Sequence, residues 1–309
     1  MTYTVVDVEP DTPEWLEERR RSVGASEVAA VMGLSEWATP FDVYRSKKGV
    51  DRPFDPLISL LGHEAERTLS RWLVELSGLN PTLTDGFMAR SVEHPFIHAT
   101  PDRMWDGIPV QIKTAHEYTS HKWDEGIPTE YRVQVQTEML VLDAPRALLV
   151  VQIGARDVRA IWEHRDDSFI QNHLIPSVAE FWNAHVALDN PPEASRITEI
   201  QERYPSEDRE IELSEQAFDL LEQITVLNSD IQAQEKERDA LKVAFANYVG
   251  TADTLTYEGQ KVATYKSQKG RQSFDAAALK RDHPEMVAGY MTQGAPFRVL
   301  RRTKPKEKK

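Results

Sequence analysis

The 309-residue sequence contains no cysteine. This absence excludes disulfide bonds, zinc–thiolate sites and cysteine-bound iron–sulfur clusters, and it suits a reducing compartment. No apolar run approaches the roughly 20 residues that a membrane-spanning helix needs, and the first residues show no basic segment followed by an apolar core. We therefore expect a cytoplasmic protein with no membrane partner.

Positive charge is also scarce. Lys and Arg number 37 against 50 Asp and Glu, which gives a formal net charge of −13. An acidic protein has no general attraction to nucleic-acid phosphates, so any such contact requires a local basic groove. One basic block is the tail 298–309, with seven Lys or Arg and one Glu. It is typical either of a disordered, solubilising end or of an arm that contacts DNA.

Residues 1–188 predict a mixed α/β unit. Threonine caps followed by proline mark helix starts at Thr12 and Thr39, and an apolar stripe at three- and four-residue spacing predicts a helix over 57–77. After Pro81 the pattern changes to short extended runs typical of strands. Further helices are predicted at 130–142 and 167–186.

The prolines of segment 189–196 predict a linker, followed by an extension over 197–297. Heptad-like apolar rows over 210–250 predict one long helix or a bent pair, which could self-associate, bind a partner or pack on the first unit. Beyond them we expect a hairpin that turns at Glu258-Gly259, a helix near 274–291 and a final strand, FRVLRR.

The stretch PDRMWDGIPVQIKTA, residues 101–115, predicts two strands joined by a tight turn. Asp102 closes the first strand, and Gln111 and Lys113 share one face of the second because side chains alternate along a strand. Phosphodiester hydrolysis needs a hard divalent cation, which oxygen ligands bind best, and a positive side chain that offsets the charge of the transition state. Asp102 and Lys113 suit these roles, although an ordinary exposed hairpin would show the same pattern.

Two helices add polar side chains to this region. Glu66 lies on the flank of its helix's apolar stripe, where it can reach the end of a strand. Tyr131, Gln134 and Glu138 recur at helical spacing, while Gln136 lies off their face. Glutamine amides can bind a phosphate or a water without adding charge, although a polar helix surface would look alike.

The order of motifs over 13–188 resembles the lambda exonuclease and YqaJ recombinase group of the PD-(D/E)xK nuclease superfamily. Each motif is short, but six occur in the order of the family. They are Trp15-x-x-x-Arg19, GASEV at 24–28, Gly62-x-x-x-Glu66, TPD at 100–102, VQIKTA at 110–115 and YRVQVQ at 131–136. The resemblance implies a restriction-endonuclease-like α/β core, in which helices flank a central mixed sheet, with a C-terminal α+β extension.

The resemblance also implies a metal site at particular positions. Glu66 and Asp102 would be metal ligands, together with the residue at 111 and the backbone carbonyl of Ile112, and Lys113 would be the catalytic lysine. Position 111 is normally a third acid in this family, but here it is Gln111, which can offer only its amide oxygen.

A second set of positions is expected to contact DNA. Arg19 and Ser26 fall where the family binds the 5′-phosphate of a duplex end, and a guanidinium fork can grip a terminal phosphate with two hydrogen bonds. Tyr131, Gln134 and Gln136 are the further DNA-binding candidates.

The activity that the resemblance implies is Mg²⁺-dependent 5′→3′ digestion of one strand of linear duplex DNA, with Mn²⁺ as a substitute. The expected partners are duplex DNA ends, a single-strand annealing protein of phage recombination and two further copies of the chain in a trimeric ring. The expected location is the cytoplasm of the host cell if a phage encodes the protein. Related nucleases of CRISPR adaptation carry a cysteine-bound cluster, which this chain cannot form.

Gln111 leaves three interpretations open. It is a native glutamine that binds metal through its amide oxygen, a deliberate Glu→Gln change, or the mark of a natural loss of activity. The competing function is accordingly an inactive DNA-end-binding protein that recruits the annealing partner. A purely structural coiled-coil adaptor would explain 210–250 but not Glu66, Asp102 and Lys113.

Overall fold

The computed structural model describes residues 2–10, 12–50, 55–292, 294 and 298–303. Two units make up the chain, Met1–Tyr204 and Pro205–Lys309. In the part of the chain that is described, no helix combines the length and the hydrophobicity needed to cross a membrane.

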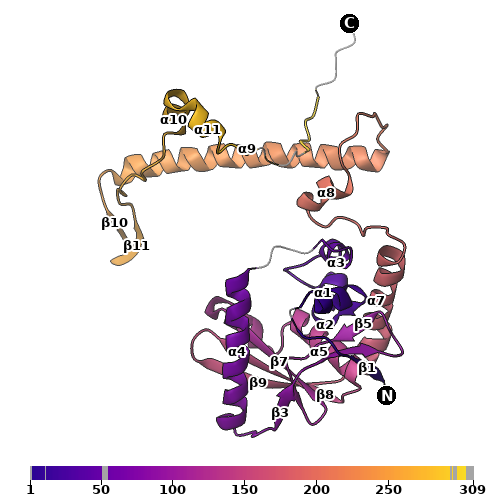
Figure 1. Cartoon of the computed structure of the whole chain (residues 1–309). Helices are drawn as coiled ribbons and strands as arrows, with labels where there is room; N and C mark the ends of the chain where they lie inside the picture. Colours follow the sequence, from indigo (N-terminus) through magenta and orange to yellow (C-terminus); the bar gives the residue numbers. More distant parts are fainter. Residues whose placement is uncertain (1, 11, 51–54, 293, 295–297, 304–309) are drawn as a thin grey trace. The chain divides into compact units, whose positions relative to one another are not determined.

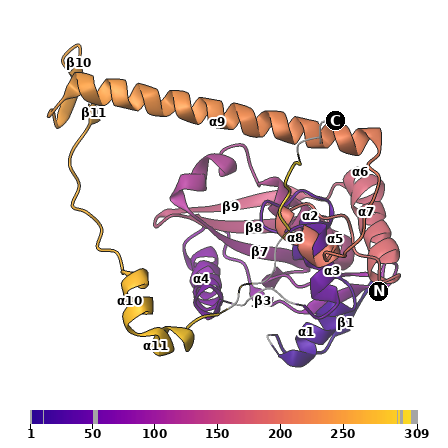
Figure 2. The same cartoon turned by 90° about the horizontal axis from the view of Figure 1, so that it is seen from above.

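Five strands of the first unit form a mixed sheet in the order β3-β6-β7-β8-β9 (Figure 1 and Figure 2). β7 and β8 run parallel, and the other neighbouring pairs run antiparallel. Asp106 and Gly107 join β6 to β7 with φ angles of 48° and 82°, the left-handed conformation that a two-residue hairpin turn requires. The strands are β3 (Leu83–Asp85), β6 (Arg103–Trp105), β7 (Ile108–Ala115), β8 (Arg146–Ile153) and β9 (Asp157–His164).

A second sheet contains four short strands in the order β1-β4-β5-β2. The chain leaves this sheet at the end of β5 and enters the larger sheet at β6, so the segment 100–102 joins the two. The five-stranded sheet is thus the expected central mixed sheet, and the described residues of this unit add a second, smaller sheet beside it. The strands are β1 (Tyr3–Val6), β2 (Val23–Gly24), β4 (Met88–Ser91) and β5 (Ile97–Ala99).

Helices α4 (Pro56–Glu75) and α5 (Thr129–Leu142) cover the two faces of the larger sheet. Alternation along β8 divides its side chains, so Leu148 and Val150 pack in one core cluster while Leu149 and Val151 pack in the other. The α4 side contains Leu69, Leu73, Val110 and Ile112, and the α5 side contains Val135 and Met139. The burial of Val110 and Ile112 on the α4 side leaves Gln111 and Lys113 on the opposite face, as the alternation predicted.

The N-terminal helices begin where their caps predicted. Thr12 accepts a hydrogen bond from the Trp15 backbone N–H at 3.2 Å, and Thr39 accepts one from that of Asp42 at 3.2 Å. The remaining helices of the core are α1 (Pro13–Arg20), α2 (Ala25–Val31), α3 (Pro40–Lys47), a 3₁₀ helix (Glu117–Trp123), and the run α6 (Asp167–Phe169), π-helical Ile170–Leu174, α7 (Ile175–Phe181) and π-helical Trp182–Val186.

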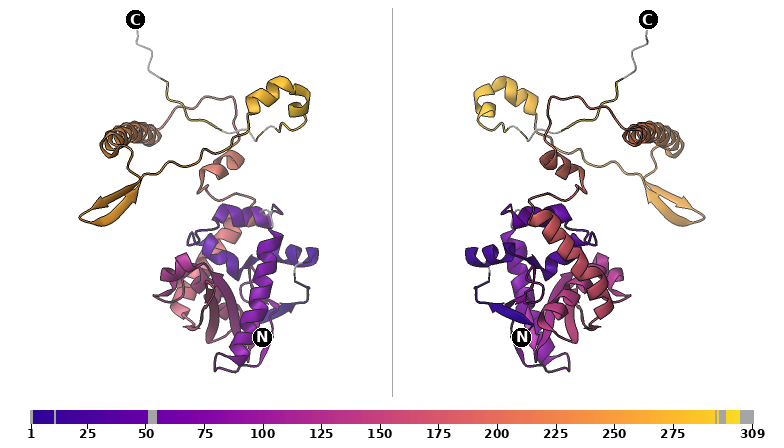
Figure 3. Two further views of the ribbon diagram at one scale, coloured as in Figure 1. Left: turned by 90° about the vertical axis from the view of Figure 1, so that its left-hand side faces the viewer. Right: turned by 90° about the vertical axis from the view of Figure 1, so that its right-hand side faces the viewer.

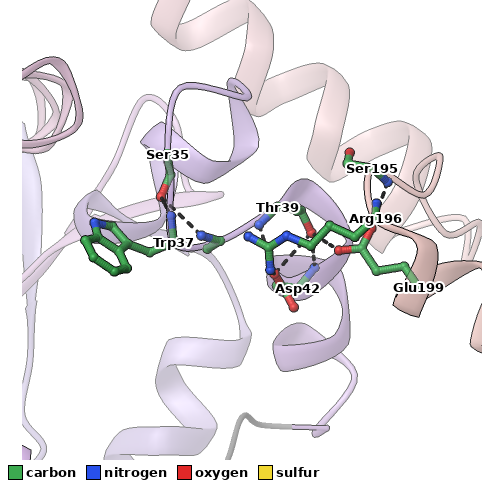
Figure 4. A network of polar contacts seen from close by, with 8 residues as sticks. Ser35, Trp37, Thr39, Asp42, Ser195, Arg196 and Glu199 are labelled. Carbon is green, nitrogen blue, oxygen red and sulfur yellow. Dashed lines mark hydrogen bonds and ion pairs between the residues drawn. The ribbon is translucent and has the colours of Figure 1, made fainter. Parts of the chain in front are cut away.

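The short helix α8 (Ile197–Arg203) is hydrogen-bonded to α3 (Figure 4). The Thr39 hydroxyl donates to Glu199 Oε1 at 2.7 Å, and the Ser195 backbone N–H donates to Glu199 Oε2 at 2.7 Å. The second bond is local to the start of α8, whereas the first joins α8 to α3 through the buried Glu199 and so holds α8 on the first unit, which ends at Tyr204.

The second unit contains one unbroken helix, α9 (Glu215–Val249), and not a bent pair. Figure 3 views this helix nearly along its axis, and it keeps one straight course. The hairpin of β10 (Thr254–Tyr257) and β11 (Gln260–Thr264) turns at Glu258-Gly259, as predicted, with positive φ angles at both residues.

Two predictions for the end of the chain were wrong in their details. The helix near 274–291 is divided into α10 (Ala276–Asp282) and α11 (Pro284–Ala288), because Pro284 lacks the N–H that would continue α10. Residues 298–303 form no strand. The first residue of the predicted strand, Phe297, and residues 304–309 of the basic tail lie outside the described residues.

Candidate active site

A polar cavity of about 560 Å³ lies where the two sheets of the first unit meet. Side chains reach it from α1, α2, α4, β7, α5 and the segment that joins β5 to β6. Among its lining residues are seven that the sequence singled out: Arg19, Ser26, Glu66, Asp102, Gln111, Lys113 and Gln134.

Asp102 is held in place by its own hydrogen bonds. Its Oδ2 accepts the Ile112 backbone N–H at 2.7 Å and the Gln111 Nε2 at 2.6 Å. Burial raises the pKa of Asp102, while the charge of Lys113 and these two hydrogen bonds act to lower it. Both bonds end on Oδ2, which leaves Oδ1 as the oxygen that can bind a cation.

Gln111 is buried on β7 and faces Asp102. A carboxylate only accepts hydrogen bonds, so the amide nitrogen of Gln111 must be the group that faces it. The amide oxygen, Oε1, is therefore directed elsewhere, and within the described residues it is buried with no hydrogen-bond partner. An unpaired buried carbonyl oxygen is unfavourable unless a donor or a cation satisfies it.

Lys113 shares the cavity face of β7 with Gln111. Its Nζ lies 5.6 Å from the ring centre of Tyr131, and Tyr131 in turn stacks on Trp123 with 5.5 Å between ring centres. Tyr131 does not itself line the cavity, so its contact with the site runs through the lysine.

Glu66 reaches the cavity from α4 and is half-buried. Burial raises its pKa and the charge of Asp102 adds to the rise, whereas His63, Arg103 and Lys113 oppose it. Arg103 Nη1 lies 3.9 Å from Glu66 Oε2. The two carboxylates therefore share one cavity with the positively charged side chains of Arg103 and Lys113.

Arg19 and Ser26 lie at another part of the cavity wall. The Arg19 guanidinium is 4.7 Å from the ring centre of Trp15 and 3.8 Å from Glu27 Oε1, so its position is restricted by two neighbours. Ser26 lies at the start of α2 and is exposed.

Gln136 does not line the cavity. It is buried, and its amide nitrogen donates to Glu163 at 2.8 Å and to the His164 carbonyl at 2.7 Å. Its amide oxygen accepts the Asp166 backbone N–H at 2.9 Å. These bonds tie α5 to the end of β9, and they follow from the two-residue offset that puts Gln134 and Gln136 on different sides of a helix.

Glu138, on α5, is a further acid near the site. It is fully buried, and Gln134 Nε2 donates to its Oε1 at 3.0 Å, while its Oε2 has no hydrogen-bond partner among the described residues. Burial raises the pKa of Glu138 to about 8, and the charge of Asp102 contributes. In the sequence, Glu138 stands out only as an acid four residues after Gln134, beside an apolar run. Helical spacing alone did not assign a role to it.

A hard divalent cation fits the oxygen donors of this cavity. Glu66 and Asp102 offer carboxylates and Gln111 offers the neutral, unpaired Oε1, whereas Ile112, whose carbonyl is a predicted ligand, is not among the residues that line the cavity. No three or more His, Asp or Glu side chains within the described ranges are grouped closely enough to hold an ion alone. The amide oxygen of Gln111 could therefore add to the ligand set.

The backbone at Gly86 packs against the segment that carries Asp102. A Cβ at Gly86 would lie 1.7 Å from the Pro101 carbonyl oxygen, so Gly86→Ala must displace the 101–102 backbone. We expect it to lower the free energy of unfolding by about 1–3 kcal/mol in denaturant titrations. The matched control is Gly62→Ala, inside α4, where a Cβ meets nothing within 4 Å and alanine favours the helix. Equal stability of the Gly86 variant and the wild type would contradict this role.

The raised pKa of Glu138 should make the stability of the protein depend on pH. Its pKa is about 8 in the folded protein and near 4.5 in the unfolded chain, so folding takes up a proton between these values. The free energy of unfolding should therefore fall as the pH rises from 4.5 to 8, by an amount on the order of 3 kcal/mol up to pH 7. Urea titrations of Glu138→Gln should show a shallower fall, whereas Glu180→Gln, at an exposed position on α7, should follow the wild type. Parallel curves for wild type and Glu138→Gln would refute the assignment.

Two exonucleases of known structure are similar to this chain. The alkaline exonuclease LHK-Exo from Laribacter hongkongensis is 22% identical, with a TM-score of 0.46 over 58% of this chain and 94% of that one. A phage-related exonuclease from Haemophilus somnus 129PT is 14% identical, with a TM-score of 0.43 over 54% of this chain and 96% of that one.

The relationship is closer at the level of sequence. The uncharacterized protein YqaJ of Bacillus subtilis (strain 168) is 30% identical over 243 residues, which cover 72% of this chain and 75% of that protein. Residues 14–145 match the YqaJ-like viral recombinase domain, and this segment contains every residue that we found lining the cavity on α1, α2, α4, β7 and α5. The chain therefore belongs to the YqaJ-like viral recombinase family.

Proposed function

We propose that this protein is a Mg²⁺-dependent deoxyribonuclease that digests one strand of linear duplex DNA in the 5′→3′ direction from 5′-phosphorylated ends. The observation that carries the proposal is the convergence of seven candidate residues, far apart in the sequence, on one cavity. Acids that can bind a cation and basic or hydroxyl groups that can bind a phosphate lie on the walls of the same space.

In this proposal Glu66, Asp102, the amide oxygen of Gln111 and the Ile112 carbonyl would hold Mg²⁺, with Mn²⁺ as a substitute. The ion, when bound, would polarise the scissile phosphate and lower the pKa of an attacking water. Lys113 would orient that water and offset the negative charge that develops on the phosphate. The two hydrogen bonds to Asp102 Oδ2 support this arrangement because they fix the carboxylate before any ion arrives.

Arg19 and Ser26 would bind the terminal 5′-phosphate. The two neighbours that restrict Arg19, Trp15 and Glu27, support this role because a pre-positioned guanidinium loses less freedom on binding. Gln134 would contact the DNA backbone from α5 without adding charge.

The proposed partners are duplex DNA ends and a single-strand annealing protein, within the cytoplasm of a host cell. We also propose a closed homotrimer. The net charge of −13 is compatible with DNA processing in such a ring, since the basic groups need only line its channel.

Gln111 favours one alternative function. A neutral amide in place of an acid removes one negative charge from the ligands of a hard cation, which weakens its binding. The alternative is a catalytically impaired protein that holds DNA ends and recruits the annealing partner.

Digestion of a linear duplex with a 5′-phosphate on one strand tests the proposal. With Mg²⁺, the wild type should degrade the phosphorylated strand, and Lys113→Ala should lower the rate by a hundredfold or more because the transition-state charge is no longer offset. Gln111→Glu is the informative companion variant, since it puts an acid at this position and also removes the amide donor to Asp102 Oδ2. If only Gln111→Glu digests the duplex, the wild type is a catalytically impaired protein that binds DNA ends. If both proteins bind the ends and neither cuts them, the proposed nuclease activity is wrong.

The role of Arg19 is tested with paired substrates that carry a 5′-phosphate or a 5′-hydroxyl. The wild type should digest the phosphorylated strand faster, and Arg19→Ala should reduce that preference by roughly tenfold because one charged hydrogen bond is lost. Arg21→Ala, which removes an exposed arginine just beyond α1, is the matched control. An unchanged preference in Arg19→Ala would remove the residue from the phosphate site.

A further inference from the structure

Lys47, near the end of α3, is a buried cation that the proposed chemistry does not use. Its side chain is 1% exposed, and it does not line the cavity. Its Nζ donates to Glu27 Oε2 at 2.6 Å and to the backbone carbonyl of Arg19 at 2.8 Å. An ammonium group is unfavourable in such a place unless partners satisfy it. The role of Lys47 therefore follows from the groups that it binds.

Those groups belong to the two helices that carry the proposed phosphate ligands. The Arg19 carbonyl lies in the last turn of α1, where carbonyls lack an N–H partner within the helix and a cation is favourable. Glu27 lies on α2, directly after Ser26. One ammonium group from α3 thus bonds the end of α1 to the start of α2, and both of these segments reach the cavity through their own side chains.

Lys47 also determines how Glu27 acts on Arg19. Glu27 Oε2 accepts the Gly24 backbone N–H at 2.7 Å as well as the ammonium group, so Oε1 is the oxygen that lies nearer to Arg19. Glu27 Oε1 and Arg19 Nη2 are 3.8 Å apart, which is longer than a hydrogen bond. The carboxylate therefore attracts the guanidinium without a hydrogen bond to it, while Lys47 offsets its charge.

We propose that Lys47 is a positioning residue of the phosphate site: it neutralises Glu27 and binds the Arg19 carbonyl, and so keeps the guanidinium available for a terminal 5′-phosphate. Without Lys47, Glu27 would pair directly with Arg19, and a phosphate would have to displace it. Lys47 itself contacts no phosphate, because it is buried outside the cavity lining. This inference rests on the proposed function, since it assumes that Arg19 binds the 5′-phosphate.

Binding of DNA ends without digestion tests this role. Hairpin duplexes with one open end, which differ only in a 5′-phosphate or a 5′-hydroxyl, are titrated with the full-length protein in EDTA. Fluorescence anisotropy gives the ratio of the two dissociation constants. The wild type should prefer the phosphorylated end. Lys47→Met keeps most of the length of the side chain without its charge, and it should reduce the preference roughly tenfold because Glu27 then pairs with the guanidinium.

A second substitution distinguishes competition for Arg19 from a loss of packing. Glu27→Gln in the Lys47→Met background removes the competing charge and should restore most of the preference, which a purely structural role of Lys47 would not predict. The matched control is Lys48→Met, which removes the next, exposed lysine and should bind both duplexes like the wild type. If thermal denaturation shows that Lys47→Met does not fold, Lys47→Gln retains a hydrogen-bond donor and carries the same prediction.

The outcomes separate the inference from the proposed function. If Lys47→Met keeps the full preference for a 5′-phosphate while Arg19→Ala loses it, the inference is wrong and the phosphate site stands. If Glu27→Gln does not restore the preference that Lys47→Met has lost, competition for Arg19 is not the cause and the inference is again wrong. If the wild type shows no preference, the inference and the proposed phosphate site are wrong together.

Discussion

The site depends on one buried carboxylate that the backbone itself fixes. Asp102 accepts the N–H of Ile112, so the loop between the two sheets is bonded to the middle of β7. That bond sets which residues of β7 lie beside Asp102, and alternation then brings Gln111 and Lys113 to the cavity while Ile112 enters the core. Gly86 permits the approach because any side chain there would meet the Pro101 carbonyl.

The sequence predicted features whose causes are local. Threonine caps, the apolar stripe of α4, the turn at Glu258-Gly259 and the alternation along β7 each depend on a few neighbouring residues, and the structure contains all of them. The division of the strands into two sheets was not predictable in this way. It depends on which strands pair across long stretches of sequence, and such pairing leaves little trace in local composition.

The site was predictable only in part, for a similar reason. Spacing predicted a group of polar residues on α5, but it could not tell that Gln134 faces the cavity while Gln136 bonds to the end of β9. Nor could spacing assign a role to Glu138. Its significance comes from full burial and from the neighbouring charge of Asp102, and both are properties of the folded chain.

Because the groups of the cavity are partly buried, the chemistry of the site does not require a positively charged protein surface. A charge in a dry site acts more strongly than one in water, so a few groups can determine what binds there while the rest of the surface stays acidic. The same principle makes each unpaired group in the site unfavourable until a ligand satisfies it. Oε1 of Gln111 and Oε2 of Glu138 are such groups, since both are buried without hydrogen-bond partners among the described residues. In the proposed function, the oxygen that Gln111 leaves unpaired is one that a bound cation would satisfy.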